Sequence, residues 1–156
     1  MGFYPIMAII KKIQQKGFVV NIKVCIMSID ISSRQDIEVL VNAFYDKVKE
    51  DPTIGYLFKD VAKVNWENHL PRMYDFWESI LFDPTVYKGN PMPVHQHLHS
   101  LSPLLPVHFQ QWKSLFLETV DLYFKGDVAE LAKQRAVSIA TVMQIKVLHP
   151  DSISGK

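Results

Sequence analysis

The sequence contains a single cysteine, Cys25, among its 156 residues. One thiol cannot form an intrachain disulfide, and it cannot supply the several thiolates that cysteine-based zinc and iron–sulfur sites require. A reducing, cytoplasmic setting is therefore expected. Long hydrophobic runs are missing too, since no uncharged apolar segment reaches the roughly 18 residues of a membrane span. We therefore expect no transmembrane helix, and no signal peptide, because a small-residue cleavage signature is also lacking.

The sequence also has no large excess of positive or negative charge. The 17 Lys and Arg residues nearly balance the 16 Asp and Glu residues, and no basic face indicates nucleic acid or an anionic membrane as a partner. Acidic residues are missing altogether from residues 84–117, so a metal site in that segment would find no carboxylate ligand there. At this length the chain is expected to fold around a single core.

Aromatic residues, in contrast, make up 12% of the sequence. So many rings in a small domain indicate either an unusually heavy core or a flat apolar guest that the fold encloses. The composition alone leaves both interpretations open.

The residue pattern divides the chain into three parts. Residues 1–27 mix basic and apolar side chains without a helical period, and we expect them to form an extension outside the folded domain, with Met27 as a hypothetical natural start. The folded domain is predicted to span residues 28–150. Residues 151–156 are expected to form a C-terminal tail.

Apolar spacing within the folded domain is helical and shows no strand-like alternation, so the predicted fold class is all-α. Ser33 is a typical N-cap for a first helix, which should end near Asp51 because proline follows it. A second apolar run covers residues 66–81, where Pro71 either lies near the helix start or kinks the helix.

A third helix is expected to open at Pro106 and to end before Gly126, and Asp127 is expected to cap a fourth helix. The connector of residues 82–106 is rich in proline, and we expect it to contain at most a short helix around residues 95–101. Four long helices would then pack together, with this connector between the second and the third.

The connector carries three alternating histidines, His95, His97 and His99. Histidine is the commonest neutral metal ligand, but zinc would need a fuller ligand set, to which only His69 and His108 could contribute. A solvated polar turn without any ligand explains the three residues equally well.

His69 lies within an aromatic and aliphatic helical stripe and is therefore expected to face the interior, where its ring nitrogens need partners. Tyr45 and Trp112 lie on or beside the interior stripes of two other helices, and each carries a polar donor. These three donors could satisfy one another or surround a small polar ligand. A haem ligated by one histidine, with donors on its other face, would explain these features together with the aromatic content.

Several motifs resemble those of the group III truncated haemoglobins of bacteria, and they occur in the order of that family between Ile31 and Val142. The sequence also contains no Gly-Gly pair, in agreement with group III. The motifs are Phe44-Tyr45-Asp46-Lys47-Val48, Asp51-Pro52, Gly55-Tyr56-Leu57-Phe58, His69-Leu70-Pro71-Arg72-Met73-Tyr74-Asp75-Phe76-Trp77, Tyr87-Lys88-Gly89-Asn90-Pro91-Met92 and His108-Phe109-Gln110-Gln111-Trp112.

The resemblance implies an abbreviated globin fold, in which two helices lie over two others and enclose haem b (iron protoporphyrin IX). It implies that His95 is the proximal iron ligand. The distal residues would be Tyr45, His69 and Trp112. Further residues would line the haem, namely Phe44, Phe58, Met73 and Trp77. His97 and His99 receive no ligand role and are read as surface residues or neighbours of the haem propionates.

Three classes of function remain open for the chain. The first, which the resemblance favours, is a haem protein that binds dioxygen, nitric oxide, carbon monoxide or cyanide. The second is a haem enzyme for nitric oxide dioxygenation or peroxide chemistry. Because the sequence has no flavin or nicotinamide motif, such an enzyme would need a separate reductase. The third is a helical interaction module without a cofactor.

Overall fold

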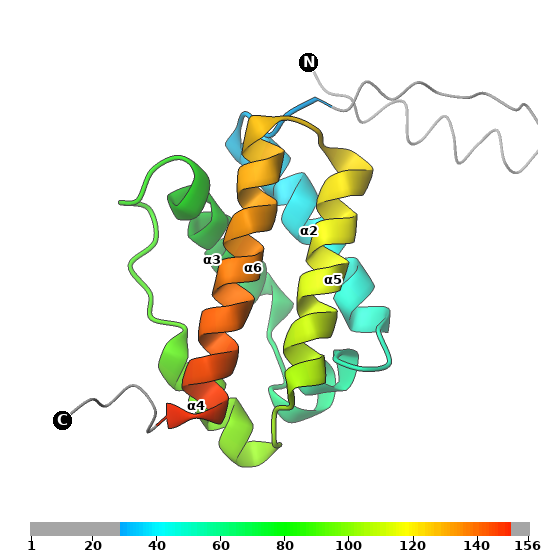
Figure 1. Ribbon diagram of the computed structural model, residues 1–156, viewed down its shortest axis with the longest axis vertical. Helices are drawn as coiled ribbons and strands as arrows, with labels where there is room; N and C mark the ends of the chain where they lie inside the picture. The colour runs from blue at the N-terminus through cyan, green and yellow to red at the C-terminus, as the bar shows by residue number, and fades with distance from the viewer. Residues whose placement is uncertain (1–28, 151–156) are drawn as a thin grey trace, which may run out of the picture.

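The computed structural model describes residues 29–150, so the expected extension with Met27 and the expected C-terminal tail lie outside the described residues. Between residues 29 and 150 every regular element is helical, and the predicted all-α fold class is confirmed (Figure 1). The elements are α2 (Arg34–Glu50), the π-helix η1 (Leu57–Val61), α3 (Trp66–Leu81), α4 (Met92–Leu101), α5 (Pro106–Tyr123) and α6 (Asp127–Leu148).

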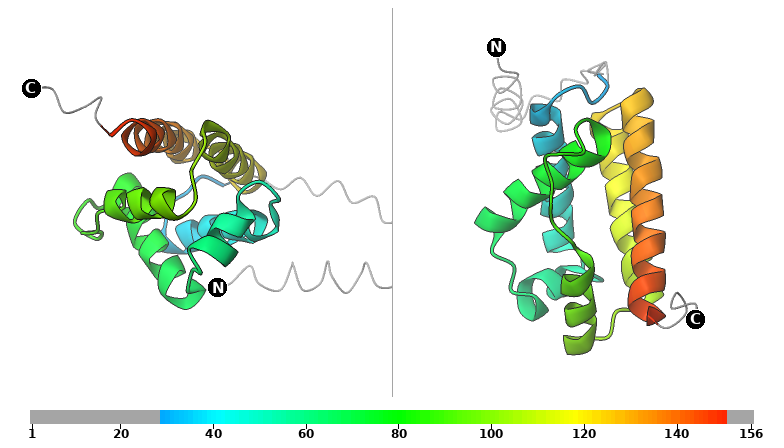
Figure 2. Two further views of the ribbon diagram at one scale, coloured as in Figure 1. Left: turned by 90° about the horizontal axis from the view of Figure 1, so that it is seen from below. Right: turned by 90° about the vertical axis from the view of Figure 1, so that its left-hand side faces the viewer.

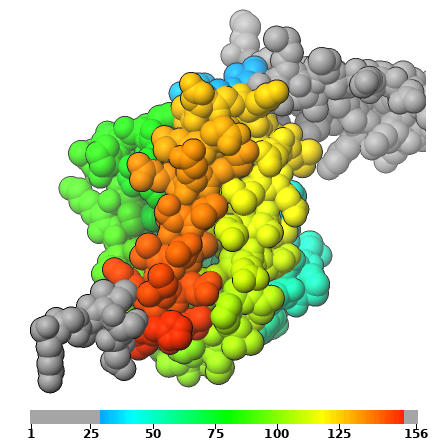
Figure 3. All heavy atoms as spheres, in the orientation of Figure 1, coloured from blue at the N-terminus to red at the C-terminus, as the bar shows by residue number. Residues whose placement is uncertain are grey.

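Two packed helix pairs form the body of the fold. Helices α5 and α6 run side by side and contact α2 and α3, which pack against each other in the second layer (Figure 2). The short helix α4 lies at one end and contacts α6. The outer surfaces of α5 and α6 cover one face of the molecule (Figure 3). No helix among residues 29–150 is long and apolar enough to cross a membrane.

Helix α2 begins and ends where the sequence predicts. The Ser33 side chain accepts a hydrogen bond from the backbone N–H of Asp36, which satisfies a donor that the first helical turn leaves open. The Asp36 carboxylate in turn accepts hydrogen bonds from both Ser32 and Ser33. Asp51 ends the helix in an extended conformation, as expected for a residue before proline.

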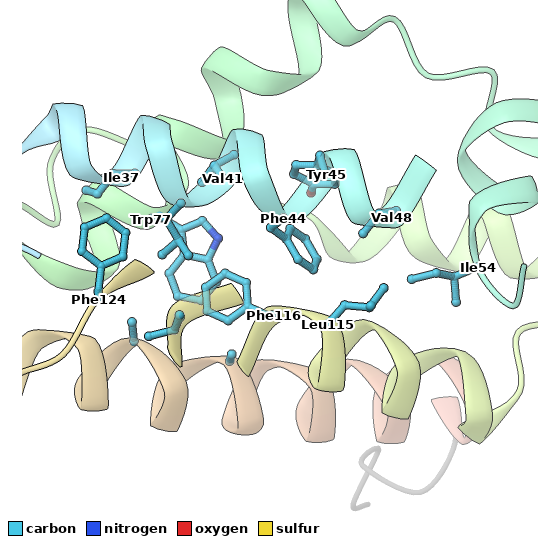
Figure 4. Close-up of a cluster of buried hydrophobic side chains, with 14 of the residues drawn as sticks. Ile37, Val41, Phe44, Tyr45, Val48, Ile54, Trp77, Leu115, Phe116 and Phe124 are labelled. Atoms are coloured by element: carbon cyan, nitrogen blue, oxygen red, sulfur yellow. The ribbon is translucent and has the colours of Figure 1, made fainter. Parts of the chain in front are cut away.

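The core lies between the two layers and is built around Phe116 of α5, which is fully buried. Trp77 of α3 stacks on it with ring centroids 4.3 Å apart, and Phe44 of α2 meets it edge-on at 5.3 Å (Figure 4). Helix α6 contributes small side chains, which allow its backbone to approach closely. These are Ala129, Ala132, Ala136 and Ala140.

The start of α6 differs from the sequence prediction. Asp127 is the first helical residue rather than the cap, and Gly126 occupies the N-cap position without a side chain to accept a bond. The missing acceptor comes from Asp30, whose carboxylate oxygens accept hydrogen bonds from Val128 N–H at 2.9 Å and Ala129 N–H at 2.8 Å. Gly126 has a φ of 153°, and a Cβ there would collide with the Asp30 side chain.

Replacing Asp30 by asparagine is expected to lower the free energy of unfolding by about 0.3–1 kcal/mol, because it removes a negative charge from a helix N-terminus and keeps one acceptor oxygen. Urea titration at neutral pH measures the change. Asp46→Asn is the matched control, since the Asp46 carboxylate is exposed and forms an ion pair with Lys49 of its own helix. Equal stabilities of the two variants would contradict the role of Asp30.

The same carboxylate should make stability depend on acid pH. Burial alone would raise the pKa of Asp30, but hydrogen bonds from the N–H groups of Val128, Ala129 and Ile31 lower the pKa below its ordinary value of 3.8. The contribution of Asp30 is therefore complete above pH 3.8 and is lost as the pH falls through the lowered pKa. The stability difference between the parent and Asp30→Asn should shrink over that range.

The second helix and the connector are more regular than the sequence suggests. Helix α3 begins at Trp66 and continues through Pro71, so His69 lies in a regular helical turn. The connector contains a complete helix, α4, which starts at Met92 and is thus three residues longer at its N-terminus than expected. Pro91 and Pro93 fit there, because the first turn of a helix does not need their missing N–H groups.

Candidate functional site

A cavity of about 420 Å³ lies at the end of the fold where α4 meets the body. Its wall comes from α2, η1, α3, α4, α5 and α6, and apolar side chains dominate it. Among the described residues 29–150, no Lys, Arg, Asp or Glu lines the cavity. The polar side chains on the wall are Tyr45, His69, Tyr87, His95, His97, His108 and Trp112. This is a pocket for a mainly apolar ligand that a few polar groups orient.

His95 projects from the first turns of α4 with one ring nitrogen fixed. Its Nδ1 donates to the backbone carbonyl of Pro91 at 2.8 Å, one helical turn earlier. Burial lowers the pKa of His95, although the hydrogen bond to Pro91 acts in the opposite direction. The ring is therefore neutral at neutral pH, with its proton on Nδ1 and the lone pair of Nε2 available to a metal.

His69 lies on the same cavity without a partner for one nitrogen. Among residues 29–150, its Nε2 is the buried side-chain polar atom that makes no hydrogen bond. Burial, followed by the charges of Arg72 and His95, lowers the pKa of His69 to about 4. A neutral ring with an unsatisfied buried nitrogen carries a free-energy cost that a polar ligand in the cavity would relieve.

Tyr45 packs directly against His69, with ring centroids 5.1 Å apart and the planes nearly perpendicular. Within residues 29–150 its hydroxyl makes no hydrogen bond, and neither does Nε1 of Trp112. Burial raises the pKa of Tyr45, so its hydroxyl keeps its proton and remains a donor. Three polar side chains from three helices thus meet one apolar cavity.

The structure places most of the predicted site residues on this cavity. His95, Tyr45, His69, Trp112, Phe58 and Met73 all line it. Phe44 and Trp77 do not line it and belong to the core behind it. Phe44 lies edge-on to both Tyr45 and Trp112, with centroids 4.9 and 5.5 Å away, and so holds these two rings in place.

Other lining residues are not among the haem-site residues that the sequence analysis predicts, and His108 is named there only as a possible zinc ligand. Ile139 and Met143 of α6 line the cavity, but an apolar residue pattern does not separate cavity wall from core, because both require apolar side chains. Tyr87 and His108 belong to motifs of the family resemblance, which was the one signal that could have found them. The sequence analysis expects His97 to be a surface residue or a neighbour of the haem propionates. In the structure His97 lies on the cavity wall and is exposed.

Helices in two layers around an apolar pocket, with one lining histidine whose Nδ1 donates to a backbone carbonyl, form the arrangement of a globin. Residues 30–147 match the family model of bacterial-like globins, and the chain belongs to that family.

Two similar proteins narrow the comparison. The chain is 26% identical over 121 residues to the group 3 truncated haemoglobin ctb of Campylobacter jejuni. The matched residues make up 76% of this chain and 93% of that protein. It also resembles the crystal structure of a group III truncated haemoglobin from Campylobacter jejuni, with a TM-score of 0.67 and 26% identity over 78% of this chain and 95% of that one. The resemblance to group III truncated haemoglobins and the abbreviated globin fold are confirmed.

Proposed function

We propose that the chain binds haem b in this cavity and holds the iron through Nε2 of His95. The bond from His95 Nδ1 to the Pro91 carbonyl is the observation that carries the proposal. Histidines that ligate metals commonly donate their other ring N–H to a carbonyl or carboxylate, which fixes the tautomer and the ring orientation. A neutral, oriented imidazole at the wall of an apolar cavity fits a haem ligand.

The remaining polar groups fit the opposite face of the haem. Haem iron with a single histidine ligand supplies an open position for a diatomic ligand such as dioxygen, nitric oxide, carbon monoxide or cyanide. The Tyr45 hydroxyl and Trp112 Nε1–H are donors without hydrogen-bond partners within residues 29–150, so both can donate to that ligand. His69 adds a neutral ring beside Tyr45. The mainly apolar wall lowers the local dielectric constant, which strengthens such hydrogen bonds.

Absorbance of the full chain titrated with haem tests the proposal. We expect binding to saturate at one haem per chain and to give a ferrous spectrum typical of five-coordinate iron with one histidine. Tyr56→Phe is a suitable control, because Tyr56 is exposed and does not line the cavity. If the chain acquires no Soret band, the proposal is contradicted. The third function class, a helical interaction module without a cofactor, would then be favoured. Turnover of nitric oxide in the presence of a reductase would add an enzymatic role.

A further inference from the structure

The connector between α4 and α5 has an unusual shortage of backbone donors. Pro103 and Pro106 carry no N–H, which leaves Leu104 and Leu105 as the two donors between them. Leu104 is only 4% exposed and lines the cavity, so its N–H needs a partner within the protein.

Both backbone N–H groups donate hydrogen bonds to histidine rings of the two flanking helices. Leu104 N–H donates to Nδ1 of His99 in α4 at 3.0 Å, and Leu105 N–H donates to Nδ1 of His108 in α5 at 3.2 Å. An Nδ1 that accepts carries no proton, so both rings are neutral with the proton on Nε2. We call these two histidines, with the two N–H groups that they receive, the connector clamp.

Helix α4 packs against α6 and, through Met92 and Leu98, against the core, but few hydrogen bonds hold its ends. None of its ten residues is fully buried, and its N-cap residue, Pro91, offers no side-chain hydrogen bond. At the N-terminal end, the Asn90 side chain accepts a hydrogen bond from Met92 N–H at 3.0 Å. The C-terminal end is held by the connector clamp, through a leucine that is anchored in the core.

His95 and His99 are four residues apart on α4 and therefore share one face of the helix. Any shift or rotation of the clamped end changes the direction in which the His95 ring enters the cavity. We propose that His99 fixes the end of α4, that His108 fixes the connector where α5 begins, and that both are positioning residues for the approach of His95 to its ligand. The inference rests on the proposed role of His95 as the iron ligand. It adds two histidines that support His95 without binding the iron themselves.

The clamp can be removed and restored by side-chain chemistry. His99→Leu fills a similar volume with an apolar side chain, but that side chain accepts no hydrogen bond. Asparagine places its side-chain oxygen near the position of a histidine Nδ1, so His99→Asn should restore the acceptor. Gln96→Leu is the matched control, because Gln96 is an exposed residue of the same helix and its side chain makes no hydrogen bond within residues 29–150.

The experiment uses the full chain loaded with ferrous haem and carbon monoxide, in which amide exchange can be followed by NMR. In His99→Leu, exchange at the Leu104 amide should quicken by about tenfold, the equivalent of one lost hydrogen bond. Haem release to an acceptor protein should also quicken by about tenfold, as for lost outer partners of other metal ligands. The iron–histidine stretching band of the ferrous form without carbon monoxide should shift in resonance Raman spectra.

His99→Asn should bring exchange and haem release back to within about twofold of the parent, and Gln96→Leu should stay within the same limit. Unchanged exchange at Leu104 in His99→Leu would overturn the clamp. Faster exchange with an unchanged iron–histidine band and unchanged haem release would overturn the positioning role and leave the proposed function intact. A parent chain that binds no haem, or whose histidine spectrum survives in His95→Ala, would overturn both.

If His99→Leu does not fold, His108→Leu and His108→Asn make the same comparison at the Leu105 amide. The expected results and the contradicting results are the same as for His99.

Discussion

Replacement of His95 by alanine is expected to abolish the spectrum of five-coordinate ferrous haem with a histidine ligand. The reason is geometric, because His95 is the lining histidine whose Nδ1 donates to a backbone carbonyl, which leaves the lone pair of its Nε2 free for the proposed iron bond. Absorbance and resonance Raman spectra of the reduced protein measure the loss. We expect haem affinity to fall as well, since a metal–ligand bond is removed from the folded state.

Two further variants separate lost ligation from lost folding. His95→Gly should recover a ligated spectrum when free imidazole is added, because the small side chain leaves room for the ring. His97→Ala and His99→Ala should both keep the histidine spectrum, although His99→Ala should release haem faster. A histidine spectrum that survives in His95→Ala and disappears in His97→Ala would show that the ligand is misassigned.

Replacement of Tyr45 by phenylalanine is expected to speed the release of dioxygen by about tenfold or more. The change removes one hydroxyl donor from the cavity while keeping the ring packed against Phe44 and His69. A hydrogen bond to a charged or strongly polarised group is worth roughly 1.5–3 kcal/mol, and about 1.4 kcal/mol corresponds to tenfold in an equilibrium constant. Stopped-flow replacement of dioxygen by carbon monoxide gives the release rate.

Trp112→Phe serves as the comparison, because it removes the second donor and keeps an aromatic ring on α5. Its effect should be smaller than that of Tyr45→Phe if the hydroxyl is the main donor. An unchanged release rate in Tyr45→Phe together with a large effect in Trp112→Phe would transfer that role to the tryptophan.

Local signals in the sequence predicted the helices well. The Ser33 cap, the Asp51-Pro52 stop and the Pro106 start each act within one helical turn, and the structure agrees at all three positions. The cap of α6 could not be predicted in this way. Its acceptor, Asp30, lies 98 residues before Val128 in the chain, and no local pattern joins the two.

The site was harder to read than the fold, since an apolar side chain is required both in a core and on a cavity wall. Phe44 and Met73 both occupy apolar stripes of the sequence, but the structure buries Phe44 behind the cavity and places Met73 on it. The role of His99 was also beyond the sequence, because its bond to Leu104 depends on the course of the connector between two helices.

The bond between Asp30 and the start of α6 also bears on the order of folding. It joins nearly the first described residue to the last helix and so closes a loop of 98 residues. Contacts of such high sequence separation require the largest loss of chain entropy and tend to form late. During synthesis the contact cannot form until α6 has left the ribosome. We therefore expect the Val128 and Ala129 amides to become protected late, so that their protection would report completion of the fold.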